Sequence, residues 1–133
     1  MAVLSRYGAG EEPDTVRCAD VVLEGVRFGA MDSARAHEFA FNEAVSFMVD
    51  CPTQEEIDRY WDALSAVPEA EQCGWLKDRF GVSWQVVPSA LGEIMTSGNQ
   101  AKVDRVTRAF LPMKKFDIAA LMAAAENREE STA

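Results

Sequence analysis

Residues 72–88, QCGWLKDRFGVSWQVVP, contain two short apolar arms around a charged, glycine-containing centre. This pattern is typical of a β-hairpin, in which alternating apolar residues share a sheet face and the polar centre forms the turn. We expect the arms at 72–77 and 82–87. Gln85 then stands where a continuous aliphatic strand would have another apolar residue, and its role is the main functional question that the sequence raises.

A four-residue loop over 78–81 would set the pairing of the two arms. It pairs Trp75 with Trp84 and Gly74 with Gln85, and directly opposed residues share a face. One predicted face comprises Cys73, Trp75, Val82, Trp84 and Val86. The other comprises Gly74, Leu76, Ser83, Gln85 and Val87.

The segments before this hairpin predict further strands. Residues 3–7, 15–24 and 26–31 are rich in strand-forming residues, with a glycine, proline and acid loop at 7–14 and a tight turn at 24–25. We expect three antiparallel strands. Residues 44–50 alternate, which predicts another strand. One of its faces carries Val45, Phe47 and Val49, and the other carries Ala44, Ser46 and Met48.

Helices are predicted on both sides of the hairpin. Thr53 and Glu56 form a capping-box pattern before a helix at about 54–65, whose apolar stripe is Ile57, Tyr60, Trp61 and Leu64. After Pro88, apolar spacing predicts a short helix around 91–95, a helix after an Asn99 cap that ends at Pro112, and a last helix from Asp117. Phe116 and Leu121 suit a hydrophobic staple at the start of the last helix.

The bulk composition fits one globular domain and excludes several partners. The chain has 133 residues, 48% of them hydrophobic, and a formal net charge of −9. This negative field repels phosphate, so we expect no nucleic acid and no anionic membrane as partner. No apolar run spans a bilayer and no secretion signal is visible, which favours a cytoplasmic location. We expect Cys18, Cys51 and Cys73 to be reduced thiols in the core.

Three long sequence segments are similar to those of a known protein family: FNEAVSFMVDCPTQEEIDRYWDALS (41–65), QCGWLKDRFGVSWQVVPSALGE (72–93) and MKKFDIAAL (113–121). The chain closely resembles the PhnB-like proteins, often labelled 3-demethylubiquinone-9 3-methyltransferase-like, of the vicinal oxygen chelate (glyoxalase/bleomycin-resistance) superfamily. The resemblance implies an α+β fold of βαβββ modules whose curved sheets enclose a cavity, commonly in dimers.

The resemblance also implies domain boundaries. One domain would cover 1–125, with a first module at 1–43, a second at 44–96 and a helical extension at 97–125, followed by a disordered tail at 126–133. Family members usually open with a strand and a helix that precede the segment matched here. We therefore expect a shortened first module, with either a homodimer that covers the bare sheet or a truncated form of the sequence.

The resemblance also addresses metal chemistry. Metal-dependent members place an acidic ligand four residues after a turn glycine, and Gly81 plus four is Gln85, a neutral amide that holds a divalent cation only weakly. The histidine expected near the start of the second module is Ala44. We therefore expect no metal and no other cofactor.

A ligand-binding role for Gln85 competes with a purely structural one, a polar side chain bonded within the sheet. The candidate ligand-binding residues are Ser46, Met48, Gly74, Ser83 and Gln85. We expect them to bind a small molecule in a metal-free cavity at a dimer interface. The alternatives are a lyase, isomerase or transferase whose site is shared between subunits, and a structural protein with a filled cavity.

Other conspicuous residues favour structural roles. His37 is the only histidine, in a connector that we expect to be exposed, although a place at the cavity mouth stays open. Lys114 and Lys115 could seat a small anion but more often serve as solvated charges. The tryptophans Trp61, Trp75 and Trp84 are expected between helix and sheet. The loop at 7–14 opens no helix, so we expect no S-adenosylmethionine site.

Overall fold

The computed structural model describes residues 2–7, 15–33 and 35–126, apart from the side chains of Ala2 and Val3. The chain divides into two compact units, Met1–Phe39 and Ala40–Ala133. Most of the loop expected at 7–14 lies outside the described residues. So does the tail expected at 126–133, except Glu126. Over the described residues the chain is α+β, with two small sheets and four α-helices.

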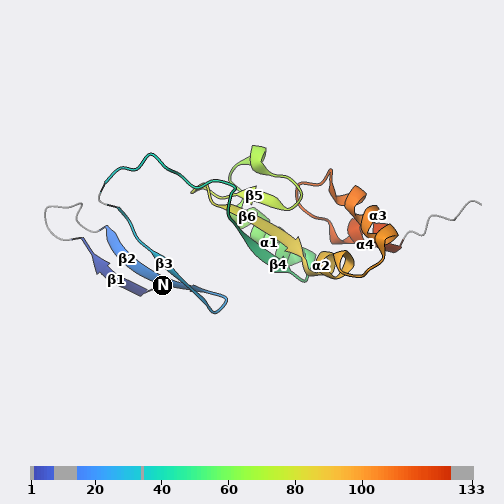
Figure 1. Ribbon diagram of the computed structural model, residues 1–133, viewed down its shortest axis with the longest axis horizontal. Coiled ribbons are helices and arrows are strands. Elements are labelled where there is room, and N and C mark those ends of the chain that lie inside the picture. Colours follow the sequence, from blue (N-terminus) through green and yellow to red (C-terminus); the bar gives the residue numbers. More distant parts are fainter. Residues whose placement is uncertain (1, 8–14, 34, 127–133) are drawn as a thin grey trace, which may run out of the picture. The chain divides into compact units, whose positions relative to one another are not determined.

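The first unit is a three-stranded antiparallel sheet in the order β1-β2-β3 (Figure 1). Its strands are β1 (Ala2–Arg6), β2 (Val16–Leu23) and β3 (Val26–Ala30). Glu24 and Gly25 join β2 to β3 with φ of 46° and 77°. Two consecutive positive φ angles are the geometry of a type I′ hairpin turn. The three predicted strands and their turn are confirmed.

The two faces of this first sheet differ in polarity. One face has the opposed pairs Ala19–Ala30, Val21–Phe28 and Leu23–Val26. On the other face, Arg27 forms an ion pair with Asp20 at 2.8 Å. Ala19 is the one buried hydrophobic residue among the described side chains of the unit. The first unit therefore has an apolar face with little of its own to cover it.

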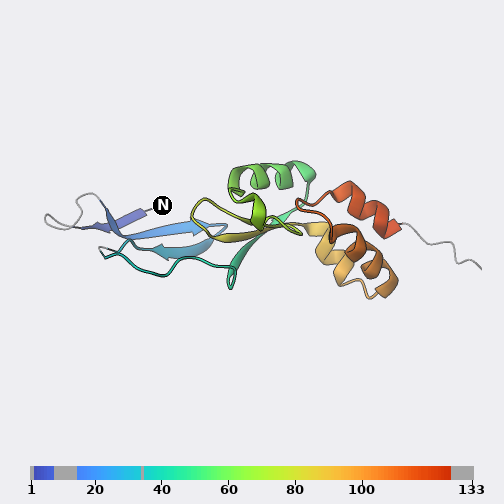
Figure 2. The same cartoon turned by 90° about the horizontal axis from the view of Figure 1, so that it is seen from above.

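The second unit begins with a mixed sheet and a covering helix. In chain order its elements are β4 (Ser46–Cys51), α1 (Gln54–Leu64), the 3₁₀ helix η1 (Pro68–Ala70), β5 (Trp75–Lys77) and β6 (Ser83–Pro88). The strand order is β4-β6-β5, with β4 parallel and β5 antiparallel to β6. Figure 2 shows α1 on one side of this sheet.

Helix α1 confirms its predicted cap and apolar stripe. The Thr53 side chain accepts the N–H of Glu56 at 3.3 Å, which satisfies one free donor at the helix start. Ile57 and Trp61 are buried. They join a core cluster with Leu76 and Val86 of the sheet. This packing fixes which sheet face α1 covers.

Three further helices complete the second unit: α2 (Ser89–Met95), α3 (Gln100–Phe110) and α4 (Ile118–Glu126). The predicted Asn99 cap is confirmed, because its side chain accepts the N–H of Lys102 at 3.1 Å. The Arg105 guanidinium donates to the carbonyls of Ala124 and Ala125, both at 3.1 Å, so an α3 cation caps the C-terminus of α4. Phe116 and Leu121, the expected staple pair, are buried in the same cluster as α1.

The predicted hairpin exists, but its register was wrong by one residue. Trp75 pairs with Gln85, and Leu76 pairs with Trp84. The loop therefore spans the five residues 78–82. Leu76 consequently shares a face with Trp84 and faces α1, while Trp75 lies on the opposite face.

The first predicted arm also starts later than expected. Gln72 and Trp75 exchange backbone hydrogen bonds at 3.1 and 2.8 Å around a two-residue turn. Cys73 and Gly74 form that turn, with φ of 48° and 79°. Residues 72–74 therefore reverse the chain, and β5 begins at Trp75.

Candidate functional site

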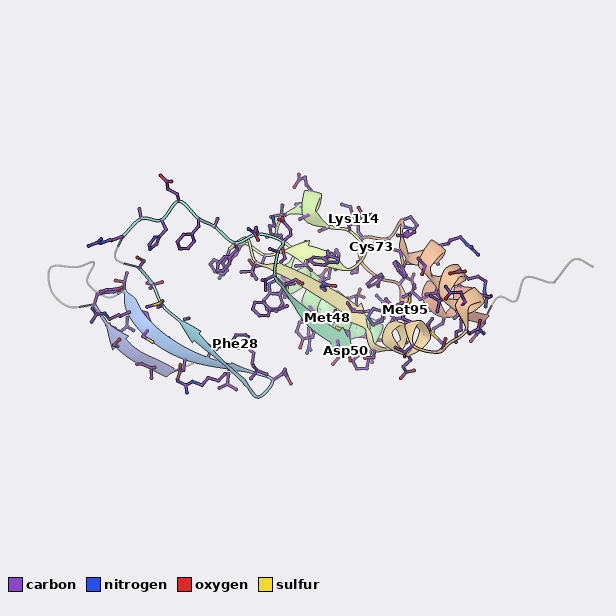
Figure 3. The ribbon with its side chains drawn as sticks, viewed as in Figure 1. Phe28, Met48, Asp50, Cys73, Met95 and Lys114 are labelled. Carbon is purple, nitrogen blue, oxygen red and sulfur yellow. The ribbon has the colours of Figure 1, made fainter. Side chains whose placement is uncertain are left out.

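The sheet face opposite α1 carries most of the predicted ligand-binding residues. Cross-strand partners share a face, so the pairings define rows of side chains. From β4 through β6 to β5, the rows are Ser46–Ser83–Lys77, Met48–Gln85–Trp75 and Asp50–Val87. We call these eight residues the site face. Figure 3 labels Met48 and Asp50, both of which come from β4.

Gln85 occupies the centre of the site face. Its Nε2 donates to Ser46 Oγ at 2.8 Å, across β6 to β4. Its side chain is half-buried, and no described residue donates to its Oε1. A glutamine in this apolar strand is therefore tolerated because it lies on the face that α1 does not cover.

The residues around Gln85 supply an apolar border. Met48 is 63% exposed, and Trp75 is half-buried on the other side of Gln85 in the same row. Ser83 is 2% exposed, so it contributes to the floor of the site face rather than its rim. Sequence reasoning missed Trp75 as a site residue because the assumed register turned it toward α1.

Gly74 does not lie opposite Gln85, contrary to the predicted pairing. Its carbonyl accepts the N–H of Val86 at 2.8 Å, and its own N–H donates to the Lys114 carbonyl at 2.8 Å. A Cβ at this position would overlap the ring of Phe116 and lie 2.9 Å from the Val86 carbonyl oxygen. The missing side chain therefore makes room for a core phenylalanine and not for a ligand beside Gln85.

Asp78 organises the loop that sets this register. Its Oδ1 accepts the N–H groups of Phe80 at 2.8 Å and Val82 at 3.0 Å, and its Oδ2 accepts Trp84 Nε1–H at 3.0 Å. Burial alone would raise the pKa of Asp78. The hydrogen bonds from Trp84, Phe80, Val82 and Gly81 together outweigh burial, so the pKa lies below its usual value.

Two charged groups stand at opposite corners of the site face. Lys77 forms an ion pair with Glu43, and the hydrogen bond from Lys77 lowers the pKa of that carboxyl. Asp50 accepts the hydroxyl of Ser89 at 2.8 Å. The positive corner is thus neutralised by its own neighbour, whereas no basic residue among those described pairs with Asp50.

The comparisons with known proteins agree with the resemblance seen in the sequence. The family model described as 3-demethylubiquinone-9 3-methyltransferase matches residues 3–87. The chain belongs to this family. A solved PhnB protein from Bacillus cereus, which carries a provisional 3-demethylubiquinone-9 3-methyltransferase assignment, is 35% identical with a TM-score of 0.54. The alignment covers 63% of this chain and 74% of that protein. No curated protein matches the chain.

Membership of the PhnB-like family places the α+β fold among the glyoxalase-like folds. The topology of the first unit bears on the methyltransferase name in the family description. Strands β1 and β2 are antiparallel neighbours. The glycine-rich turn of a nucleotide-binding fold instead joins a strand to a helix.

Metal-ligating residues do not gather in the part of this PhnB-like chain that the structure describes. No group of three or more histidine, cysteine, aspartate or glutamate residues there could hold a metal ion. Cys18, Cys51 and Cys73 are free. No helix in the described ranges is both long and apolar enough to cross a membrane.

The remaining candidate residues have local partners. His37 is exposed, lies 2.7 Å from Ser33 Oγ through its Nε2, and stacks on Phe39 with ring centroids 4.7 Å apart. Lys114 pairs with Glu71 at 3.2 Å, and Lys115 pairs with Asp58 at 2.8 Å. These pairs favour the structural interpretation of the two lysines over an anion site.

Proposed function

We propose that this PhnB-family chain binds a small molecule without a metal ion, over the site face, in a cavity that a second copy of the chain completes. The observation that carries the proposal is the position of Gln85. It lies on the sheet face opposite α1, bonds to Ser46, and keeps one acceptor atom unused by the described residues. An oriented amide between apolar side chains is a common arrangement in small-molecule sites.

The chemistry of Gln85 supports binding more than metal-dependent catalysis. The resemblance places an acidic metal ligand at this position, and an amide supplies only one neutral oxygen there. An amide also cannot accept a proton at neutral pH. Orientation of a ligand through a hydrogen bond is the functional role that an amide can perform here, beside the structural bond that it makes to Ser46 within the sheet.

The second copy is proposed because the first unit leaves apolar side chains uncovered. Leu23 and Val26, on the apolar face of the first sheet, are both exposed. Contiguous exposed apolar surface is typical of a face that packs against a partner. We propose that residues 1–125 form one domain, and that the second copy in a homodimer covers its shortened first module. The location is cytoplasmic, because three free cysteines suit a reducing compartment.

A thermal-shift screen of small metabolites tests the proposal with the variant Gln85→Leu. Leucine fills a similar volume but cannot bind a polar ligand atom. We expect compounds that stabilise the wild-type protein, by about 2.7 kcal/mol at a hundred times Kd, and no such stabilisation of the variant. Gln100→Leu, on the exposed start of α3, is the matched control and should respond like the wild type.

Metal analysis of the purified protein separates this proposal from the alternative of a vicinal-oxygen-chelate enzyme with a site shared between subunits. We expect less than stoichiometric zinc, nickel or manganese. One tightly held metal ion per chain, lost in Gln85→Leu, would overturn the proposal and favour the enzyme.

A further inference from the structure

The central row of the site face consists of electron-rich groups. Trp75 presents an indole, Met48 a polarisable thioether, and Gln85 the amide oxygen that no described residue binds. Indole faces attract cations, and thioethers make favourable contacts with aromatic rings. The row therefore favours a flat ring that is electron-poor.

The charges around this row point to the same ligand. Lys77 is neutralised by Glu43. Asp50, one row along from Met48, has only the Ser89 hydroxyl as a partner among the described residues. The uncompensated charge of the site face is thus negative, and the whole chain carries −9. Both the local and the long-range fields attract cations.

The spacing of the strands limits the size of the ligand. Met48 and Trp75 lie on strands separated by β6, so their backbones are about 10 Å apart at roughly 4.8 Å per strand. Asp50 is two residues beyond Met48, about 7 Å along β4. One six-membered ring over Gln85 fits within the first distance, and a positive nitrogen at the edge of the ring can face along the second.

We propose that the site face selects a planar aromatic organic cation. The ring lies over Gln85 between Met48 and Trp75, a donor on the ligand binds Gln85 Oε1, and the positive nitrogen faces Asp50. This inference rests on the proposed function and names the class of ligand that it takes.

Three probes that share one ring test the charge preference: nicotinate, nicotinamide and the 1-methylnicotinamide cation, which is methylated on the ring nitrogen. They carry −1, 0 and +1. Their affinities are measured by ligand-detected NMR at low salt. We expect the cation to bind most tightly, nicotinamide about fivefold to tenfold more weakly, and nicotinate least.

Asp50→Asn should remove most of the preference for the cation and leave nicotinamide binding unchanged. Asp62→Asn, on the exposed surface of α1, changes the net charge equally and should keep the preference, which separates the local carboxylate from the overall field. Trp75→Leu should abolish binding of all three probes, whereas Trp75→Phe, which keeps a ring, should weaken it only partly.

Two results would overturn the inference. One is that nicotinate binds as tightly as the cation, and the other is that Asp50→Asn and Asp62→Asn reduce the preference for the cation equally. If none of the probes binds while the metabolite screen finds another ligand that depends on Gln85, the cation inference fails and the proposed function stands. If no ligand depends on Gln85 in either experiment, both fail.

Discussion

Gly74 shows how one residue fixes the junction between the hairpin and the helical extension. Its φ of +79° is rarely adopted by other residues, and its hydrogen atoms face the Phe116 ring and the Val86 carbonyl. Phe116 is buried in the core that α1 and α4 share with the sheet. A side chain at position 74 would therefore strain the backbone and displace a core ring together.

Gly74→Ala should be strongly destabilising. The positive φ costs an alanine about 1–2 kcal/mol, and overpacking against a buried ring and a backbone carbonyl adds about 1–3 kcal/mol. We expect a loss of about 3 kcal/mol in the free energy of unfolding, measured by urea denaturation followed by circular dichroism.

Gly98→Ala is the matched control for this prediction. Gly98 has a similar φ of +73° in the same unit, but nothing lies within 4 Å of its added Cβ. Its variant should lose only the backbone part, about 1 kcal/mol. Equal losses in the two variants would show that contact with Phe116 contributes nothing.

At the residue scale, sequence could place some site residues and not others. Strand alternation correctly put Ser46 and Met48 on one face of β4, and Ser83 and Gln85 on one face of β6, because a period of two does not depend on the partner strand. Gly74 and Trp75 were misplaced because their faces depend on the register between strands. Alternation within one strand carries no information about that register.

At the scale of the element, the hairpin loop decides the register. Asp78 binds two backbone N–H groups and the Trp84 indole, which holds a five-residue loop where a four-residue loop was assumed. The helices were easier to predict, since Thr53 and Asn99 cap them locally and their apolar stripes do not require knowledge of a distant partner. Local signals fixed the helices, whereas side-chain bonds within the loop fixed the hairpin.

Asp78→Ala should destabilise the second unit and make its stability less dependent on pH. The substitution removes the carboxylate that accepts three hydrogen bonds. Hydrogen bonds to a charged group contribute about 1.5–3 kcal/mol each to the free energy of unfolding. The folded-state pKa of Asp78 lies below its usual value. At pH values between the folded-state and unfolded-state pKa, the unfolded protein therefore binds more protons than the folded protein. The contribution is therefore fully present above about pH 4 and is lost as the pH falls through the depressed pKa.

Urea denaturation of both proteins at pH 7 and near pH 2.5 measures this contribution. The difference in the free energy of unfolding between the wild type and Asp78→Ala should be large at pH 7 and small near pH 2.5. Asp104→Ala, on the surface of α3, should differ from the wild type by close to zero in the free energy of unfolding at both pH values. A difference for Asp78→Ala that stays constant with pH would mean that the loop does not depend on the ionised carboxylate.

At the scale of the whole molecule, the chain contains one unit with a substantial core and one without. Residues from α1, α2, α3 and α4 bury a shared cluster with β5 and β6 in the second unit. The first unit has an apolar face on which Leu23 and Val26 are exposed. Sequence could identify the strands of the first unit but not what covers them, because the covering surface is not encoded in those strands.

Val26→Glu tests the proposed homodimer. Val26 lies on the apolar face of the first sheet and is 58% exposed in the single chain. If a second copy covers this face, a buried carboxylate in the interface would be strongly unfavourable. We expect the wild type to be a dimer at micromolar concentration in light scattering, and the variant to dissociate at least tenfold more readily.

Val22→Glu is the control that separates an effect on the dimer interface from a general loss of folding. Val22 is 62% exposed in the same sheet, but it is opposite Arg27 on the face that carries the Asp20–Arg27 ion pair. A glutamate there has a cation beside it and should leave the dimer intact, so the two variants differ only in the face they modify. Equal dissociation in both would point to a general loss of folding, and a monomeric wild type would remove the second copy from the proposed cavity. Dissociation of Val26→Glu alone, with loss of ligand binding, would show that ligand binding depends on the dimer.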